Sequence, residues 1–352
     1  MTGPVSSHQP PIEAESAQLL PPAGAPALSS ARQHLMEEYL MSEITRTTPE
    51  TAPRSAPARR RRLLIAVPAG AAALALAATV AVAALTGAEQ TGTFGDRIPA
   101  PVVQVAGGQT AQLASTVERI SLAAAAAPDL DPKPGQYLYI ESTVSNLSST
   151  VDLEKSSSKT WVDKPHTRLV WLAADGRDGR LVEDGKTPAE GQELKGGEGA
   201  WSAPSLVFLK GLPTDPQELL QQIYAGTAGQ GTGPDQEAFV TIGDLIREQA
   251  VPGKLAAALY RAAAKIPGVV LVDSAADAAG RPGIAIARTD PTTGTRSELI
   301  FDGSSYAFLG ERSVQVTEGK GVKAGTVTAN NAVTRRAVVD AVGLRPGAVA
   351  RT

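Results

Sequence analysis

The side chains best suited to acid–base or metal chemistry are few in this sequence. The chain has three histidines and no cysteine, so a zinc site built from thiolates is impossible. His8 and His34 precede a long apolar run, which leaves His166 alone in the larger part of the chain. One histidine cannot form a multi-histidine metal site. We expect His166, which follows Pro165, to be an ordinary residue at the start of a strand.

The serines lack the partners that nucleophilic catalysis requires. Ser156 and Lys159 have the Ser-x-x-Lys spacing of β-lactamase-like enzymes, but neither Ser-Asp-Asn nor Lys-Thr-Gly accompanies them. The chain also lacks Gly-x-Ser-x-Gly, the motif that presents a serine on a strand-to-helix turn. A polar loop is the better interpretation of residues 156–159, and no catalytic residue is predicted.

Acidic and glycine-rich stretches are typical of turns rather than of ligand sites. A calcium loop needs oxygen ligands at alternate positions, but the alternate positions after Asp175 hold Arg177 and Gly179. The glycines within 226–233 have no Lys-Ser/Thr pair after them, so a phosphate cradle is not predicted. The other carboxylates are scattered, as on a solvated surface. We therefore predict no metal and no cofactor.

Aromatic side chains are the strongest candidates for ligand binding. Only 4% of the residues are aromatic, yet Tyr137, Tyr139, Trp161, Trp171 and Trp201 fall in one part of the chain. They would line an apolar groove for a peptide, lipid or glycan. The alternative is that they form the core of their sheet. We favour the core, because large aromatic side chains usually pack inside.

The element that must position this part of the chain is a membrane anchor. Arg59, Arg60, Arg61 and Arg62 precede a run without Asp, Glu, Lys or Arg that extends to Ala88. About 23 apolar residues reach roughly 34 Å as a helix, enough for a hydrocarbon core of about 30 Å. Arginines on the leading side place the N-terminus in the cytoplasm. The sequence thus predicts a single-pass transmembrane helix over 63–86 and an extracytoplasmic remainder.

A cleaved export signal is the rival interpretation of the same run. Small residues at 81–83 resemble a cleavage site, and Arg60 and Arg61 before two leucines faintly resemble a twin-arginine signal. Against cleavage stand the long leader and the length of the run, since a signal core has only about 7–15 apolar residues. We favour the uncleaved signal anchor.

The segment before the span has two parts of different composition. Residues 1–28 are rich in Pro, Ala, Ser and Gln and are predicted to be disordered. Residues 29–45 are predicted to form a short cytosolic helix that would contact a protein partner, and 46–62 form a basic linker. The alternative for 29–45 is a weak surface helix, because isolated helices of this length are marginal in water.

The segment after the span reads as a tether over 87–108 and an α+β domain over 109–352. Apolar spacing predicts four helices, at 110–127, from Asp215, at 235–249 and after Pro252. Alternation and turn residues predict strands, at 136–147, 159–162, 167–172, 269–273, 283–289, 295–301, 305–316 and 325–339. We expect a curved antiparallel sheet with helices covering one face.

Overall composition narrows the class of protein. The formal net charge is −3 over 352 residues, without the basic excess of a nucleic-acid binder, so no nucleic-acid partner is predicted. The absence of cysteine from an exported domain leaves packing as the source of stability. A wealth of Ala, Gly, Pro, Arg and Val suggests a GC-rich bacterial genome, and hence a bacterial cell membrane.

Several stretches together resemble an uncharacterised actinobacterial family of single-pass membrane proteins. The stretches are the helix within 32–44, the arginine-flanked span, and residues 137–139, 235–248, 259–262, 266–269 and 298–312. Members are often encoded beside extracytoplasmic-function sigma factors, so the resemblance implies a signalling role. It supplies no catalytic residue. The outer domain also looks somewhat like the curved sheet of periplasmic lipoprotein carriers and sigma-regulator sensors, which is an analogy of fold alone.

Two functions of different class follow from these observations. The first is a non-enzymatic, membrane-anchored sensor or regulator that binds an unknown envelope ligand outside and a cytosolic protein through 29–45. The second is a membrane-tethered carrier or envelope-binding protein for a lipid, peptide or glycan. The cysteine-free chain departs from the zinc-containing anti-sigma factors, whose His-x-x-x-Cys-x-x-Cys cluster it cannot form.

Overall fold

The computed structural model describes residues 97–152, 157–195, 200–319 and 322–347. No helix within these ranges is long and apolar enough to cross a membrane. The predicted span at 63–86, its four arginines (Arg59 to Arg62), the helix at 29–45, the linker at 46–62 and the disordered 1–28 all lie outside the described residues.

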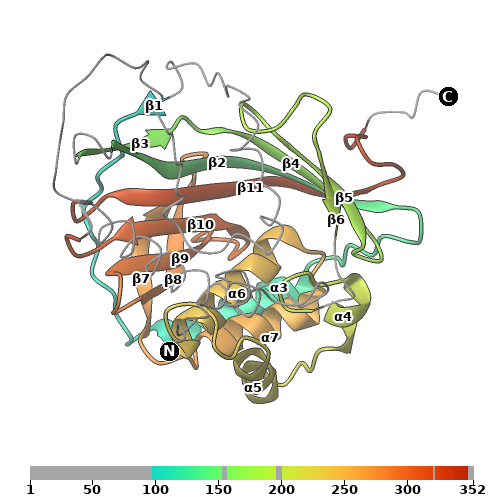
Figure 1. The fold of residues 1–352 in the computed structure, drawn as a ribbon. Coiled ribbons are helices and arrows are strands. Elements are labelled where there is room, and N and C mark those ends of the chain that lie inside the picture. The colour runs from blue at the N-terminus through green and yellow to red at the C-terminus, as the bar shows by residue number, and fades with distance from the viewer. Residues whose placement is uncertain (1–96, 153–156, 196–199, 320–321, 348–352) are drawn as a thin grey trace, which may run out of the picture. The chain divides into compact units, whose positions relative to one another are not determined.

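Eleven strands form one antiparallel sheet in the described part of the chain (Figure 1). Nine of them are hydrogen-bonded in the order β6-β5-β4-β2-β11-β10-β9-β8-β7, while β3 pairs with the far part of β2 and carries β1. The strands are β1 (Arg97–Ile98), β2 (Tyr137–Asp152), β3 (Ser157–Asp163), β4 (His166–Ala173), β5 (Asp178–Glu183), β6 (Gln192–Lys195), β7 (Val269–Ala276), β8 (Pro282–Thr289), β9 (Thr295–Phe301), β10 (Phe308–Gln315) and β11 (Val327–Val339).

The last strand, β11, lies beside the first long strand, β2, in the middle of the sheet. β11 pairs along most of β2, from Ala329 opposite Asn146 to Val339 opposite Tyr137, and β4 pairs along the other side of β2. One helix precedes β2, and the other described helices lie in the connection between β6 and β7.

Five helices are described: α3 (Leu113–Ala126), α4 (Leu206–Gly211), α5 (Pro216–Gly226), α6 (Pro234–Glu248) and α7 (Gly253–Ala263). Local chemistry sets their ends. Asp215 caps α5, because its Oδ1 accepts hydrogen bonds from the backbone N–H groups of Gln217 and Glu218, both at 2.9 Å. Pro216 occupies the first turn, where its missing N–H is harmless.

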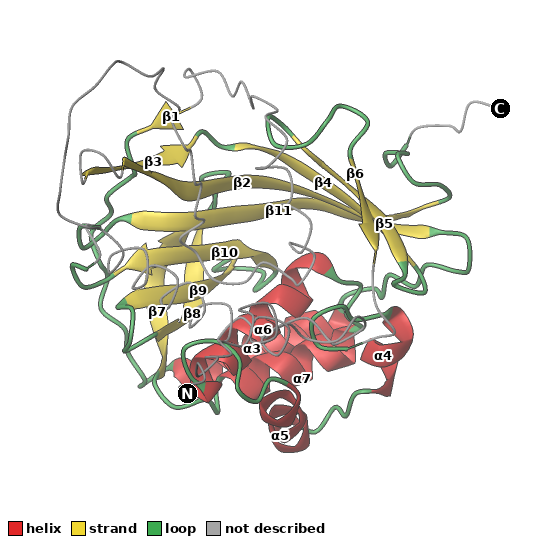
Figure 2. Cartoon of the chain, in the orientation of Figure 1, coloured by secondary structure: helices red, strands yellow, loops and turns green. Residues whose placement is uncertain are grey.

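The helices pack on one face of the sheet and form the main core with it (Figure 2). Phe239 and Leu259 from α6 and α7 join Leu299 and Phe301 from β9 in this cluster. The ring of Tyr260 meets that of Phe301 edge-on, with centroids 5.0 Å apart. Each such side chain contributes roughly 1.5–3 kcal/mol when it is fully buried, so this layer fixes the position of α6.

The α+β prediction, with an antiparallel sheet and helices, is confirmed for the described residues. The four predicted helices and all eight predicted strands appear, with shifted ends in every case but β9. Four elements were not predicted. β1 lies in the stretch interpreted as a tether, and β5, β6 and α4 lie in stretches dominated by turn residues or too short to show a period.

The predicted tether at 87–108 needs correction over its second half. Backbone bonds join Val103 N–H to the carbonyl of Gly325 at 2.8 Å, and Gln109 N–H to that of Leu271 at 2.9 Å. Arg97 and Ile98 form β1 against β3. Residues 97–108 therefore belong to the domain, since strand ends with free backbone groups offered them hydrogen-bond partners.

Candidate functional site

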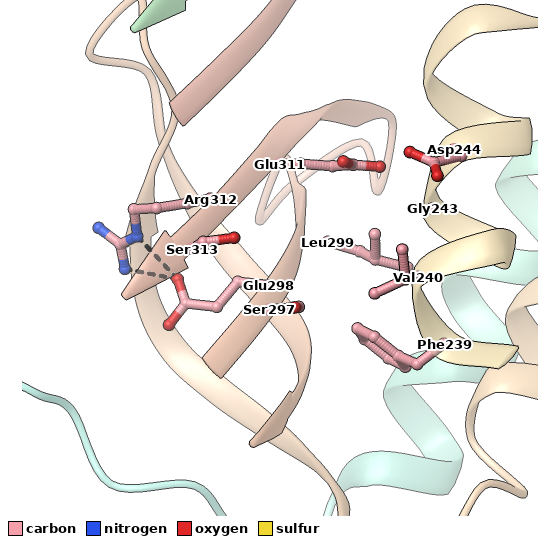
Figure 3. Close-up of a pocket in the computed structure, with 10 residues that line it drawn as sticks. All are labelled: Phe239, Val240, Gly243, Asp244, Ser297, Glu298, Leu299, Glu311, Arg312 and Ser313. Carbon is pink, nitrogen blue, oxygen red and sulfur yellow. Dashed lines mark hydrogen bonds and ion pairs between the residues drawn. The ribbon is translucent and has the colours of Figure 1, made fainter. Parts of the chain in front are cut away.

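The candidate site lies where the second half of α6 meets the sheet. α6 sends Phe239, Ile242 and Leu245 into the core. Another side of the helix turns Asp244 toward β10 (Figure 3), and Arg247 pairs with Glu311 of that strand. An amphipathic helix normally turns such charged residues to water. Here Arg247 instead pairs with Glu311 of the sheet.

A small cavity of about 30 Å³ separates the helix from β9 and β10. In Figure 3, Asp244 of α6 and Glu311 of β10 point toward each other across this gap. The volume corresponds to one or two water molecules. Its wall residues are Phe239, Val240, Gly243, Asp244, Ser297, Glu298, Leu299, Glu311, Arg312 and Ser313.

Gly243 sets how closely the helix approaches the sheet. A Cβ atom at this position would lie 2.7 Å from Glu311 Oε1 and 3.0 Å from Leu299 Cδ2, both tighter than ordinary contacts. Glycine therefore allows the carboxylate of Glu311 to lie directly against the helix backbone.

Arg247 binds both carboxylates. Its Nη1 is 2.6 Å from Glu311 Oε2, and its Nη2 is 2.7 Å from Asp244 Oδ1. The guanidinium is planar and has donors on several sides, so one arginine can hold two separate acceptors. Glu311 Oε1, on the other side of that carboxyl group, is buried and has no hydrogen-bond partner among the described residues.

The two acids share one arginine, and the three side chains are only 14–18% exposed. Burial raises the pKa of Asp244 well above its usual value, and Arg247 offsets only part of this effect. Burial likewise raises the pKa of Glu311. For Arg247, burial lowers the pKa, but the carboxylates of Glu311 and Asp244 outweigh it and the pKa rises. Burial acts on both acids in the same direction, and the single cation Arg247 offsets it only in part for each of them.

The ion pairs continue from α6 onto β4 and β5. Glu248 accepts a hydrogen bond from Arg168 Nε at 3.0 Å, and Arg168 Nη1 donates to Glu183 at 2.7 Å. Burial raises the pKa of Glu183, but the hydrogen bond from His166 and the charge of Arg168 bring it down to about 2. These residues are therefore charged over the whole physiological range, and they fix α6 to the outer strands of the sheet.

Arg336 of β11 holds the C-terminal end of α6. Its Nη2 donates to the backbone carbonyls of Ile246 and Arg247, which have no further helical turn to bond to. A cation at this end also complements the helix dipole. Burial lowers the pKa of Arg336, and its guanidinium lies 5.7 Å from the centre of the Phe308 ring.

The predicted aromatic residues do not line one groove. Tyr139 and Trp171 are opposite each other on β2 and β4, and their ring centroids are 5.4 Å apart. Tyr137 packs against the same cluster. Trp161 lies on β3, near the far end of β2. Trp201 belongs to the helix-side core, where its ring meets Phe208 edge-on at 5.2 Å.

The ion-pair cluster was not predicted from the sequence. The interpretation of the carboxylates as a solvated surface is wrong for Glu248 and Glu298, which are 6% and 1% exposed. No local signal marked the cluster, because Asp244 and Arg247 lie outside the apolar stripe of α6, where charged residues normally face water. Glu311, the sheet partner of Arg247, lies 64 residues away, so spacing could not reveal it.

His166 begins β4, as predicted, but it is also part of this cluster. Its Nε2 lies 2.9 Å from Glu183 Oε1, and although burial lowers the pKa of His166, this hydrogen bond raises it overall. No group of three or more His, Cys, Asp or Glu side chains in the part of the chain that the structure describes could hold a metal ion. What the arrangement offers chemically is a pair of acids that are held by one arginine beside a small polar cavity.

No protein-family model matches this chain, and a search of curated proteins finds no significant match. The likeness to the actinobacterial single-pass family accordingly stays an expectation from the residues.

Proposed function

We propose that this chain is a non-enzymatic, membrane-anchored sensor or regulator. In this proposal the α+β domain lies outside the bacterial cell membrane and binds an envelope ligand. Residues 63–86 form the single span, and 29–45 contact a cytosolic protein. From the resemblance described above, we propose that this cytosolic protein is an extracytoplasmic-function sigma factor or a protein that controls one.

The observation that carries the proposal is the charged contact between α6 and the sheet. A sensor needs an element with two arrangements that a ligand can bias. The ion pair between Arg247 and Glu311 supplies such an element, because it joins α6 to β10 and would be lost if the helix moved. The pair between Arg247 and Asp244 lies within the helix. A ligand or proton that changes the charge of this contact changes the free energy with which α6 is held.

The same residues argue for a binding role over acid–base catalysis. Asp244 and Glu311 each have Arg247 as a partner at 2.6–2.7 Å, and Glu248 and Glu183 share Arg168. Carboxylates engaged in this way support the structure of the domain.

The test compares two deletions in the full-length protein. The variant without residues 29–45 should reach the membrane but fail to restore the wild-type phenotype to a strain that lacks the gene. The variant without 1–28 is the matched control and should restore it. If both variants restore the phenotype equally, the cytosolic helix has no signalling role and the sensor proposal is wrong.

A tethered carrier or envelope-binding protein is the second candidate. The aromatic cluster of Tyr139 and Trp171 supports it, because a single chain segment covers that cluster from outside. For a carrier, deletion of 29–45 would leave the phenotype intact, since the span would serve only as a tether.

A further inference from the structure

An aromatic surface lies on the face of β2 and β4 that points away from the helices. Tyr139 and Trp171 form its centre, with Leu169 and Val339 beside them. Strand alternation separates this face from the helix side, where Leu138, Ile140 and Val170 belong to a different cluster. Its rim is polar, because the hydroxyl of Tyr139 donates to Glu141 at 2.8 Å.

The chain's own C-terminal segment, residues 340–347, covers this surface. Val342, Leu344 and Pro346 are half-buried, whereas Gly343, Arg345 and Gly347 between them are exposed. Val342 and Leu344 pack on the aromatic cluster. The segment reaches the cluster through turns rather than as an extended chain, because Gly343 and Gly347 have φ values of 86° and 81°.

A main-chain contact fixes the segment on the aromatic surface. The indole N–H of Trp171 donates to the backbone carbonyl of Leu344 at 2.6 Å. The other contacts hold its beginning: Gln136 Nε2 donates to Asp340 at 2.9 Å, and Leu344 N–H closes a turn onto the carbonyl of Ala341. β11 ends at Val339, so the segment is not a strand of the sheet.

We propose that the surface of Tyr137, Tyr139 and Trp171 binds peptides, and that residues 340–347 occupy it in cis. The ligand class is a short peptide that turns at a glycine and has an aliphatic side chain on each side of it, as Val342 and Leu344 flank Gly343. A bond from the Trp171 N–H to a carbonyl is available to any peptide, and the aliphatic positions supply the selectivity. Trp and Tyr are also the side chains that most often dominate protein interfaces.

Release of the segment is what makes the surface a binding site. Each large aromatic side chain buries about 150–250 Å², so uncovering two of them exposes an apolar patch of the size that marks interaction sites. A peptide in solution competes with the cis segment, and its apparent affinity falls with the fraction of time for which the segment is bound. This inference holds for the sensor and for the carrier alike.

The experiment measures binding of a fluorescent peptide with the sequence of residues 340–347 by anisotropy. Three forms of the detergent-solubilised protein are compared: the full chain, the chain without 341–352, and the full-length double substitution V342S/L344S. We expect both altered forms to bind the peptide about tenfold or more tightly than the full chain does. Adding W171F to the shortened chain should weaken binding roughly fivefold through loss of the indole donor.

Two control peptides distinguish a surface that binds peptides in general from a core that accepts only its own segment. A peptide with isoleucine at both aliphatic positions should bind about as well as the native sequence, and one with serine at both should not bind. Binding of the native sequence alone would overturn the inference, because a core segment requires one particular shape. Loss of the folded state in both altered proteins, or folded proteins that bind no better than the full chain, would overturn it as well.

Discussion

At the scale of single residues, Arg247 is the side chain on which the α6 contact depends. It is the cation that holds both Asp244 and Glu311. A buried ion pair adds little to stability compared with an apolar replacement of the whole pair. Removing one partner is a different change, because the other charges then stay buried without compensation.

We expect R247M to lower the free energy of unfolding by about 3–5 kcal/mol. The measurement is urea unfolding of the solubilised protein followed by tryptophan fluorescence, which reports on the domain because all three tryptophans (Trp161, Trp171 and Trp201) lie in it. R261M is the matched control. Arg261 pairs with Glu118 at 2.8 Å on the surface, with the two side chains 34% and 52% exposed, so its removal should change the midpoint little.

The R247M effect should depend on pH in a defined direction. Both acids have raised pKa values in the folded state, chiefly through burial. The folded protein thus binds more protons than the unfolded one between the unfolded and folded pKa values, and stability falls as pH rises through that window. Without Arg247 the penalty grows, so the variant should lose more stability at pH 8 than at pH 5. An R247M protein as stable as R261M at both pH values would contradict this account of the site.

At the scale of elements, the position of α6 depends on a close approach that glycine permits. Gly243 faces Glu311 and Leu299 at distances that leave no room for a methyl group. Alanine is the better helix former by about 1 kcal/mol, so helix propensity and packing oppose each other at this position. The contacts of 2.7 and 3.0 Å are to side-chain ends, but Arg247 holds Glu311 and the core holds Leu299, so we expect packing to outweigh propensity.

We expect G243A to destabilise the protein by about 1–3 kcal/mol through overpacking. The control is G211A, because a Cβ atom at Gly211 in α4 meets no atom within 4 Å. That variant should be as stable as the parent or slightly more so. Thermal unfolding of the two proteins side by side decides the question, and a G243A protein at least as stable as G211A would show that α6 does not depend on this contact.

Most elements could be predicted from the sequence because their signals are local. Period-two alternation marked β2 at Tyr137, and Asp215 before Pro216 marked α5. β5 and β6 were missed because the many Asp-Gly pairs in 175–199 indicate turns, and the two strands form only by pairing with β4 and with each other. The candidate site was missed for a related reason. Asp244 looks like a surface carboxylate until β10, 67 residues further along, brings Glu311 to it.

At the scale of the whole molecule, we propose that the folded domain follows a membrane span. The structure supports an α+β domain that begins by Arg97, and the sequence predicts an anchor that ends near residue 86. If both hold, about ten residues connect them, so the domain stays close to the membrane surface. This closeness distinguishes a sensor from a freely diffusing binding protein, and it depends on the anchor remaining uncleaved.

The most direct test of this central claim is cysteine accessibility, for which a chain without native cysteine is well suited. A114C places a thiol at an exposed position of α3, and T48C places one in the segment before the four arginines. In intact spheroplasts, a membrane-impermeant maleimide should label A114C, and it should label T48C only after the membrane is opened, with both chains retaining an N-terminal tag. Labelling of T48C from outside, protection of A114C, or a labelled A114C chain that has lost its tag would contradict a single-pass anchor with an external domain.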